Sequence, residues 1–282
     1  MLREILRWIL WSRPARRVLV AGLFAALWAA ASWGLGPKKV GRPVRGFPSP
    51  GDYPEGLAWD GHYLWSNNFS NSTLYKVDPA TGATVGSYTD PQLPRFPEGL
   101  AWDGTHLWTC DHESGRIMKV AVTPTGVSVV ATYDKPPEAG NPVGLEWDGS
   151  NLWLACFGAH VGETSELWKL DPKTLQSVGF LRLPVYWVED LAWDGLRLWS
   201  VDWIFDLGFA IDVTTGDTLN TYKPAGPHPV GQAWDGQYLW LSDTVHDSLY
   251  ATDISEARTT VEHTTWSELK RLFGGSSNSS VR

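Results

Sequence analysis

The feature that most constrains this chain is a motif, W-D-G-x-x-L-W, which occurs five times without a mismatch. Its first tryptophans lie 43, 45, 46 and 41 residues apart, and they are Trp59, Trp102, Trp147, Trp193 and Trp234. A period in this range is typical of repeat architectures, in which each repeat forms one supersecondary unit. The chain is therefore interpreted first as an array of five similar units.

Each repeat predicts four short antiparallel strands. In the first repeat the apolar segment 55–59 is closed by Asp60 and Gly61, a dipeptide typical of tight hairpin turns. The next three strands are expected at 63–67, 72–78 and 83–88. Four strands in about 44 residues are typical of a propeller blade, so we expect an all-β, five-bladed β-propeller with four-stranded antiparallel blades.

The propeller is expected to span residues 37–263, and residues 264–282 to form a short helix and a disordered tail. The repeats are placed near 54–90, 97–134, 142–183, 188–223 and 229–263. The paired tryptophans are expected to fill the wedges between blades, since burying one aromatic side chain removes about 150–250 Å² from water.

Closure of the ring requires an outer strand for the last blade. Residues 40–47 are one candidate, because the segment 45–56 is similar to 87–99, the outer strand and loop that precede the second repeat. Residues 258–263 are the competing candidate. The first assignment would join the two ends of the propeller in one sheet.

Residues 1–36 differ from the rest of the chain. Five arginines precede an uncharged apolar run at 18–35, which is 18 residues long. This pattern is typical of a membrane span with its C-terminal side outside. The alanines at 29–31 also offer a signal-peptide cleavage site. We expect an N-terminal transmembrane or signal helix, and hence a periplasmic or extracellular propeller that is either anchored to the membrane or secreted.

The charge of the remaining chain restricts its partners. Residues 37–282 contain 18 basic and 30 acidic residues, a formal net charge of −12. Such a surface repels phosphate backbones, so nucleic-acid binding is not expected. Cationic ligands or metal ions are the natural partners.

The two cysteines, Cys110 and Cys156, occur near equivalent points of neighbouring repeats. One disulfide is compatible with a compartment outside the cytoplasm. The alternative, which we favour, is a pair of buried small apolar residues.

Two sets of residues are expected to meet at one end of the inner strands, because the start of a first strand lies beside the end of the second. The first-strand ring is Glu55, Glu98, Val143, Glu189 and Val230. The second-strand ring is Asn68, Asp111, Cys156, Asp202 and Asp243. The repeats agree at the tryptophans and differ at these positions, as expected of a repeated scaffold that carries a single site.

The same end collects aromatic residues from the loops of the fourth repeat, which are Trp187, Trp203 and Phe205. Carboxylates beside aromatic rings suit an ammonium group, through ion pairing and cation–π contact. The expected ligand-binding residues are Glu55, Asn68, Asp111, Glu189, Asp202, Asp243, Trp187, Trp203 and Phe205. The alternative is that the acids are solvated rim charges and the aromatics pack under loops.

No metal site is assigned, although one set of residues could form one. Carboxylates from several blades are suitable oxygen ligands for Ca²⁺. The set that could hold such an ion is Glu55, Glu98, Asp202 and Asp243. This set would suit a metal-dependent hydrolase of the lactonase or esterase kind.

The first repeat, "PEGLAWDGHYLW…STLYKVDPATGATV", resembles the plant and bacterial type of glutaminyl cyclase (glutamine cyclotransferase), and more generally propeller repeats of the NHL and YVTN kinds. The resemblance implies a five-bladed propeller that cyclises N-terminal glutamine with loss of ammonia. It also implies that Glu98, within "FPEGLAW", would be the catalytic acid and base.

Three functions remain open at this point. The first is a binding propeller that captures a cationic or peptide ligand at an acidic, aromatic-rimmed site. The second is a glutaminyl cyclase-like acyltransferase that uses Glu98, and the third is the metal-dependent hydrolase. We favour the first, because likeness in fold alone is a poor guide to activity.

Overall fold

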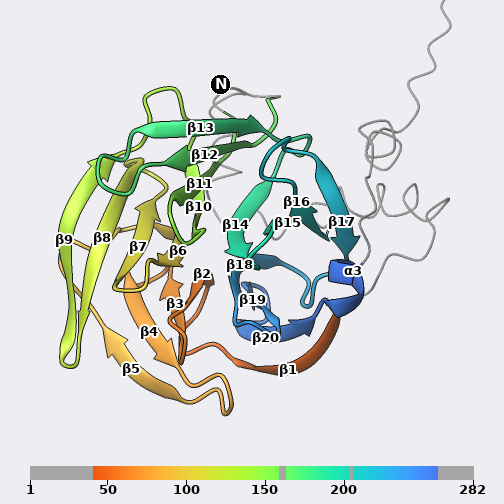
Figure 1. Ribbon diagram of the computed structural model, residues 1–282. Helices are drawn as coiled ribbons and strands as arrows, with labels where there is room; N and C mark the ends of the chain where they lie inside the picture. The colour runs from red at the N-terminus through yellow and green to blue at the C-terminus, as the bar shows by residue number, and fades with distance from the viewer. Residues whose placement is uncertain (1–40, 159–162, 204–205, 260–282) are drawn as a thin grey trace, which may run out of the picture. The chain divides into compact units, whose positions relative to one another are not determined.

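The computed structural model describes residues 41–158, 163–203 and 206–259, which belong to one compact unit, Lys39–Thr265. They form five four-stranded antiparallel sheets arranged around a common centre (Figure 1), so the expected five-bladed all-β propeller is confirmed. The segment 1–36, residues 264–282 and Phe205 lie outside the described residues. Within the described ranges, no helix is long and apolar enough to span a bilayer.

The blades follow one another along the chain. Blade one contains β2 (Pro54–Trp59), β3 (Leu64–Asn68), β4 (Thr73–Val77) and β5 (Thr84–Tyr88). Blade two contains β6 (Pro97–Trp102), β7 (His106–Asp111), β8 (Arg116–Thr123) and β9 (Gly126–Asp134). Blade three contains β10 (Pro142–Trp147), β11 (Leu152–Cys156), β12 (Glu166–Leu170) and β13 (Ser177–Arg182). Blade four contains β14 (Val188–Trp193), β15 (Leu198–Asp202), β16 (Leu207–Ile211) and β17 (Thr218–Tyr222). Blade five contains β18 (Pro229–Trp234), β19 (Leu239–Asp243), β20 (Ser248–Asp253) and β1 (Arg42–Pro48), and α3 (Ser255–Thr259) follows β20.

A hydrogen-bonded Asp–Trp pair explains the spacing of the repeated motif. In blade one, Oδ1 of Asp60 accepts the backbone N–H groups of His62 and Tyr63, which closes the turn between β2 and β3. Oδ2 of Asp60 accepts the indole N–H of Trp65 at 2.8 Å. The same pair recurs in the other four blades, at Asp103–Trp108, Asp148–Trp153, Asp194–Trp199 and Asp235–Trp240.

A lysine from the third strand completes this arrangement in blades one to three. Lys76, Lys119 and Lys169 approach the aspartate at 3.2, 3.2 and 2.9 Å, and each ammonium also lies over the neighbouring indole ring. Burial raises the pKa of each aspartate. The hydrogen bonds from the indole, the backbone amides and the lysine outweigh burial, so that pKa lies below its ordinary value of 3.8.

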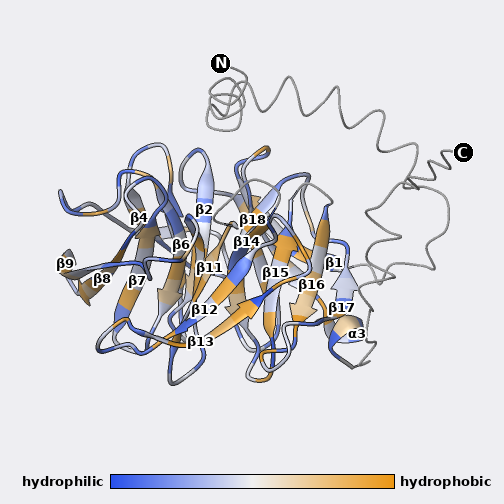
Figure 2. Cartoon of the chain, turned by 90° about the horizontal axis from the view of Figure 1, so that it is seen from above, coloured by the Kyte–Doolittle hydropathy of each residue, from blue (hydrophilic) through white to orange (hydrophobic). Residues whose placement is uncertain are grey.

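The apolar core is divided among the seams between neighbouring blades. Each seam encloses one cluster of buried side chains, built around the second tryptophan of a motif, which is at most 3% exposed. In Figure 2 the hydrophobic colour follows the strands, whereas the loops are mainly hydrophilic. The prediction that these tryptophans fill the wedges between blades is confirmed.

Cys110 and Cys156 lie in the cluster between blades two and three, and both are free thiols. Burial raises the pKa of both thiols. The disulfide alternative is therefore wrong, and the prediction of two buried small side chains is confirmed.

The ring is closed by β1, which pairs antiparallel with β20 from Arg42↔Asp253 to Pro48↔Ser248. The N-terminal segment at 40–47 therefore supplies the outer strand of blade five, as expected. The competing candidate for this strand, 258–263, is wrong, because Arg258, where that strand would begin, lies in helix α3.

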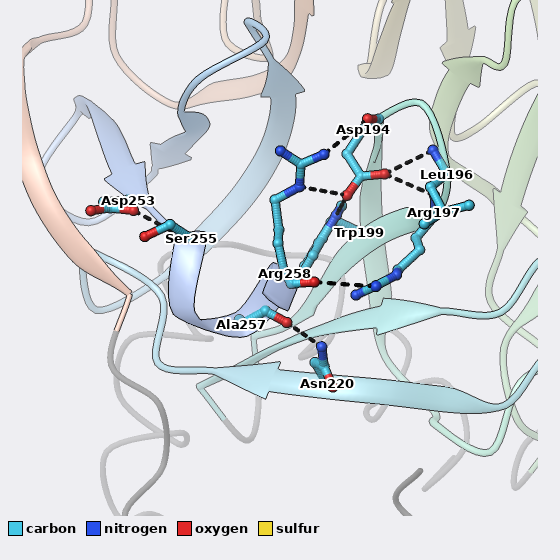
Figure 3. A network of polar contacts seen from close by, with 9 residues as sticks. All are labelled: Asp194, Leu196, Arg197, Trp199, Asn220, Asp253, Ser255, Ala257 and Arg258. Carbon is cyan, nitrogen blue, oxygen red and sulfur yellow. Dashed lines mark hydrogen bonds and ion pairs between the residues drawn. The ribbon is translucent and has the colours of Figure 1, made fainter. Parts of the chain in front are cut away.

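Helix α3 fastens blade five to blade four, and Figure 3 shows its contacts. Blade four has Ala210 in the register position of the lysines. Arg258 of α3 supplies the missing cation, with its Nε 3.0 Å from Oδ2 of Asp194. The carbonyl of Arg258 accepts a hydrogen bond from Arg197, and that of Ala257 accepts one from Asn220 of β17. A single turn of helix thus replaces a side chain that the fourth repeat lacks.

Removing this cation is expected to weaken the propeller in a pH-dependent way. Arg258→Ala leaves the carboxylate of Asp194, 2% exposed, without its charged partner, and we expect a loss of about 1–3 kcal/mol in the free energy of unfolding at pH 7. Burial raises the pKa of Asp194, but its hydrogen bonds and Arg258 bring it below 3.8. The stabilisation of the folded state by Asp194 is therefore fully present at pH values above the pKa of the unfolded chain. It is lost as the pH falls through the lower pKa of the folded state.

Urea denaturation at pH 7 and at pH 3 measures the free energy of unfolding of the variant and the parent protein. We expect the difference between the two proteins to be smaller at pH 3. Arg42→Ala is the control, because Arg42 is 68% exposed in its 3.6 Å pair with Asp253 and should contribute less than about 0.5 kcal/mol. An equal loss in the two variants would contradict the role assigned to Arg258.

Candidate functional site

The structure places the two predicted rings side by side at one end of the propeller, which we call the mouth. Each residue of the second-strand ring pairs with the residue that precedes the first-strand ring. The pairs are Pro54↔Asn68, Pro97↔Asp111, Pro142↔Cys156, Val188↔Asp202 and Pro229↔Asp243. The expected meeting of the two rings is thus observed.

Every residue of the first-strand ring lies at an irregularity of its strand. In blade one the register shifts between Pro54 and Leu57, so that Glu55 and Gly56 both stand opposite Asn67. Equivalent shifts occur in the other four blades. Such a β-bulge bends a strand and re-aims a side chain, and bulges are frequent beside active sites.

The three glutamates of this ring are buried at the mouth. Glu55, Glu98 and Glu189 are 3%, 9% and 6% exposed, which argues against the alternative of solvated rim charges. Two of these bulges are hydrogen-bonded to a neighbouring blade. The carbonyl of Glu98 in blade two accepts a hydrogen bond from Asn67 of blade one, and that of Glu55 in blade one accepts one from Ser242 of blade five. The positions of Glu55 and Glu98 are therefore fixed by contacts between blades one, two and five.

Glu98 has a chemical neighbour that sequence reasoning did not identify. Nδ1 of His112 lies 3.7 Å from Oε1 of Glu98, and it makes no hydrogen bond within the described part of the chain. Phe69 occupies the corresponding place in blade one. The signal was present in the sequence, since His112 directly follows Asp111 of the second-strand ring.

His112 begins a row of aromatic side chains that crosses four blades. Its ring meets Phe157 at 6.2 Å, Phe157 meets Trp187 at 5.4 Å, Trp187 meets Trp203 at 6.4 Å, and Trp203 meets His228 at 4.7 Å. These centroid distances are typical of favourable aromatic pairs. We call these five residues the aromatic arc. The predicted site residues Trp187 and Trp203 thus lie together in it.

The polar members of the second-strand ring anchor loops. Oδ1 of Asp243 accepts the N–H groups of Val245 and His246, and Oδ2 accepts that of His228. Asp111 makes the equivalent three bonds in blade two, and Oδ1 of Asn68 accepts the N–H of Ser70 in blade one. Asp202 is 1% exposed. These hydrogen bonds show that Asp111, Asp243 and Asn68 support the loops of the mouth.

A metal centre is not evident from the geometry. Across the residues that the structure describes, no three carboxylate, imidazole or thiol groups converge closely enough to hold a metal ion. The proposed set of Glu55, Glu98, Asp202 and Asp243 is distributed over blades one, two, four and five.

Asp190 is a buried acid that sequence reasoning missed. It stands in β14 at the place where the other inner strands have glycine. Its carboxylate accepts backbone N–H groups from Leu57, Leu145 and Gln232, which belong to three other blades. Alignment of the five repeats would have shown this substitution, because the residue after each member of the first-strand ring is otherwise glycine.

Comparison with solved structures finds the same architecture. The crystal structure of Myxococcus xanthus glutaminyl cyclase matches with a TM-score of 0.63 and 16% identity, over 81% of this chain and 99% of that chain. The PQQ-bound aldose sugar dehydrogenase of Streptomyces coelicolor matches at 0.52 and 14%, over 78% and 99%. A chain of a nidogen/laminin complex matches at 0.52 and 17%, over 76% and 81%.

No protein-family model and no curated protein sequence matches the chain. Identities of 14–17% show the fold alone. At the level of the fold, the comparisons confirm the resemblance to glutaminyl cyclase. This chain forms the five-bladed propeller that the resemblance implies. Since one fold carries many functions, the site itself has to support any activity.

The loop-anchoring role of Asp243 predicts a selective loss of stability. Asp243→Asn replaces one of two acceptor oxygens with an NH₂ group, so at least one of three partly buried hydrogen bonds is lost. We expect the free energy of unfolding to fall by about 1–3 kcal/mol, measured by urea denaturation. The exposed Asp134→Asn should change it by less than about 0.5 kcal/mol. A loss no larger than this control would mean that Asp243 does not support the mouth.

Proposed function

We propose that this chain is a membrane-anchored, extracytoplasmic propeller that binds a positively charged amino group, of a peptide or a small molecule, at the mouth. The observation that carries the proposal is the set of three buried glutamates, Glu55, Glu98 and Glu189, at the same register position of three blades, next to the aromatic arc. His112 belongs to the arc and lies 3.7 Å from Glu98, so one of the three acids lies directly beside the rings.

The chemistry of this site suits an ammonium ion. Carboxylates accept its N–H groups, and aromatic faces attract the charge with about 0.5–2 kcal/mol per contact. Low exposure strengthens both terms, because water screens charges less in a buried site. The formal net charge of −12 on residues 37–282 attracts cations towards the surface and speeds their association. The apolar Val143 and Val230 complete the first-strand ring and would contact the carbon skeleton of the ligand.

The proposed location rests on residues 1–36. Their five arginines and apolar run would hold the propeller on the outer side of a membrane, or direct its secretion if the segment is cleaved. An extracytoplasmic site would meet peptides and amines from the surroundings of the cell.

Binding can be tested with matched peptides. We expect alanyl-phenylalanyl-alanine with a free N-terminal amine to bind at least about tenfold more tightly than its N-acetylated form, by isothermal titration calorimetry. The triple variant Glu55→Gln, Glu98→Gln, Glu189→Gln should remove that preference, because its amides are neutral. Asp134→Asn, exposed on the outer strand β9 of blade two, should keep it. Equal affinity of the two peptides for the parent protein would refute the proposal.

A second candidate, a glutaminyl cyclase-like activity, is favoured by the contact between Glu98 and His112. In this reaction the α-amino nitrogen of an N-terminal glutamine attacks the side-chain amide carbon, and the bond to the departing ammonia breaks. Glu98 would take the proton from the amine and return it to the leaving nitrogen. His112 would help to orient the carboxylate of Glu98.

Blades one and two provide a matched test, because β2 and β6 have the same sequence, PEGLAW. Ammonia release from glutaminyl peptides should fall about 10²–10⁴-fold in Glu98→Gln. Glu55→Gln, at the same position of blade one, where Phe69 stands in the place of His112, should lose less than about tenfold. Absence of ammonia release from the folded parent protein would remove this candidate and leave amine binding untouched.

A further inference from the structure

One carboxyl group lies at the centre of the propeller, below the mouth. Asp190 is 2% exposed, and its side chain reaches across the ring of inner strands. Oδ2 accepts the backbone N–H groups of Leu57 at 3.1 Å and Gln232 at 3.2 Å. Oδ1 accepts that of Leu145 at 3.1 Å. The N–H of Leu191, in its own strand, also favours the charged form of this carboxylate.

These four N–H groups occupy one equivalent position in four blades. Each lies two residues after a member of the first-strand ring, which means that the amides of Leu57, Leu145, Leu191 and Gln232 converge from β2, β10, β14 and β18. Amides that converge from an approximately fivefold ring form a concave set of donors, the geometry in which proteins bind anions. Here the anion is part of the chain.

The inner strands leave little room at this level for anything else. A Cβ atom at Gly99 would lie 2.3 Å from the nitrogen of Leu145, and one at Gly231 would lie 1.8 Å from the carbonyl oxygen of Glu55. Glycine at these positions therefore lets neighbouring backbones touch. Blade four alone carries a side chain at this position, and that side chain fills the centre.

The charges around Asp190 explain why it needs so many donors. Burial raises the pKa of Asp190 well above its usual range, and the backbone N–H groups around its carboxylate act in the opposite direction. Glu146 of β10 is a nearby acid whose own pKa is raised, first by burial, with Asp190 a further cause. Asp190 also helps to raise the pKa of the Cys110 thiol, after burial and Glu98. No cation among the described side chains pairs with Asp190, so the backbone amides are its partners.

We propose that the centre of the propeller is a carboxylate-binding site made of backbone amides, and that the chain's own Asp190 occupies it. By holding the bulges of blades one, three, four and five at a fixed spacing, Asp190 acts as a positioning residue for the mouth. When its side chain is removed, the vacated amides bind a small free carboxylate, such as formate or acetate. The link to the mouth rests on the proposed amine binding, whereas the carboxylate site does not.

Removal and replacement of the carboxylate test the site directly. Asp190→Gly gives all five inner strands glycine at this position and should lower Tm by about 5 °C or more. Sodium formate should restore at least half of that loss, relative to sodium chloride at the same ionic strength. Asp190→Asn keeps the volume of the side chain and blocks the site, so formate should not restore its Tm. Arg258→Ala is the matched control for general salt effects, because its lesion lies at helix α3.

The outcomes separate the two proposals. An equal response to formate in Asp190→Gly and Arg258→Ala, or no response in either, would overturn the carboxylate site. If Asp190→Gly does not fold, hydrogen exchange of the parent protein decides, and fast exchange at the amides of Leu57, Leu145 and Gln232 would overturn it. Rescue of Tm by formate without peptide binding in any variant would keep the carboxylate site and remove the proposed function. Recovery of peptide binding with formate would support the positioning role.

Discussion

The hydrogen bond between an aspartate and an indole five residues later is the interaction on which the rest of this propeller depends. It joins the turn of each hairpin to the largest side chain in the adjacent seam, so that closing the turn and packing the seam become one event. A buried indole N–H needs an acceptor, and a buried carboxylate needs donors. In the motif, the indole N–H donates to the carboxylate, so each group provides the hydrogen-bond partner that the other needs. Its strict repetition follows from this double requirement.

The same interaction explains how the ring is closed by unlike parts. Blades one to three each supply a lysine to the aspartate, whereas blades four and five have alanine at that register position, Ala210 and Ala251. Arg258 provides the cation for blade four, and Phe47 of β1 stacks on Trp240 of blade five at 5.6 Å. Arg258 and Phe47 come from the two ends of the propeller segment. Arg258 replaces a missing cation, whereas Phe47 supplies the outer-strand ring that Tyr88 and Tyr133 supply in blades one and two. The blades that depart from the repeat are therefore the ones that the chain ends complete.

Most of the fold could be predicted from the sequence, and less of the site. Strand order, hairpin turns and closure by residues 40–47 follow from local periodicity and from similarity between repeats. The contacts of Asp243 and Glu98 do not, because each inner strand contains a bulge. A one-residue change in register reverses the face on which a side chain lies. The same sequence pattern therefore predicted that Asp243 and Asp111 stand near the mouth, without revealing that their oxygens are held by loop amides.

Chemical identity at the mouth arises where the repeats differ. The segments β2 and β6 are identical in sequence, yet Glu98 lies beside His112 while Phe69 takes that place in blade one. The properties of these two glutamates therefore depend on the residue after the second strand, on a separate segment of the blade. Asp190 follows the same logic, since a single departure from glycine provides the carboxylate that three other blades share. A fivefold scaffold thus becomes an asymmetric site through a few substitutions at equivalent positions, and those positions are where an altered function would be introduced.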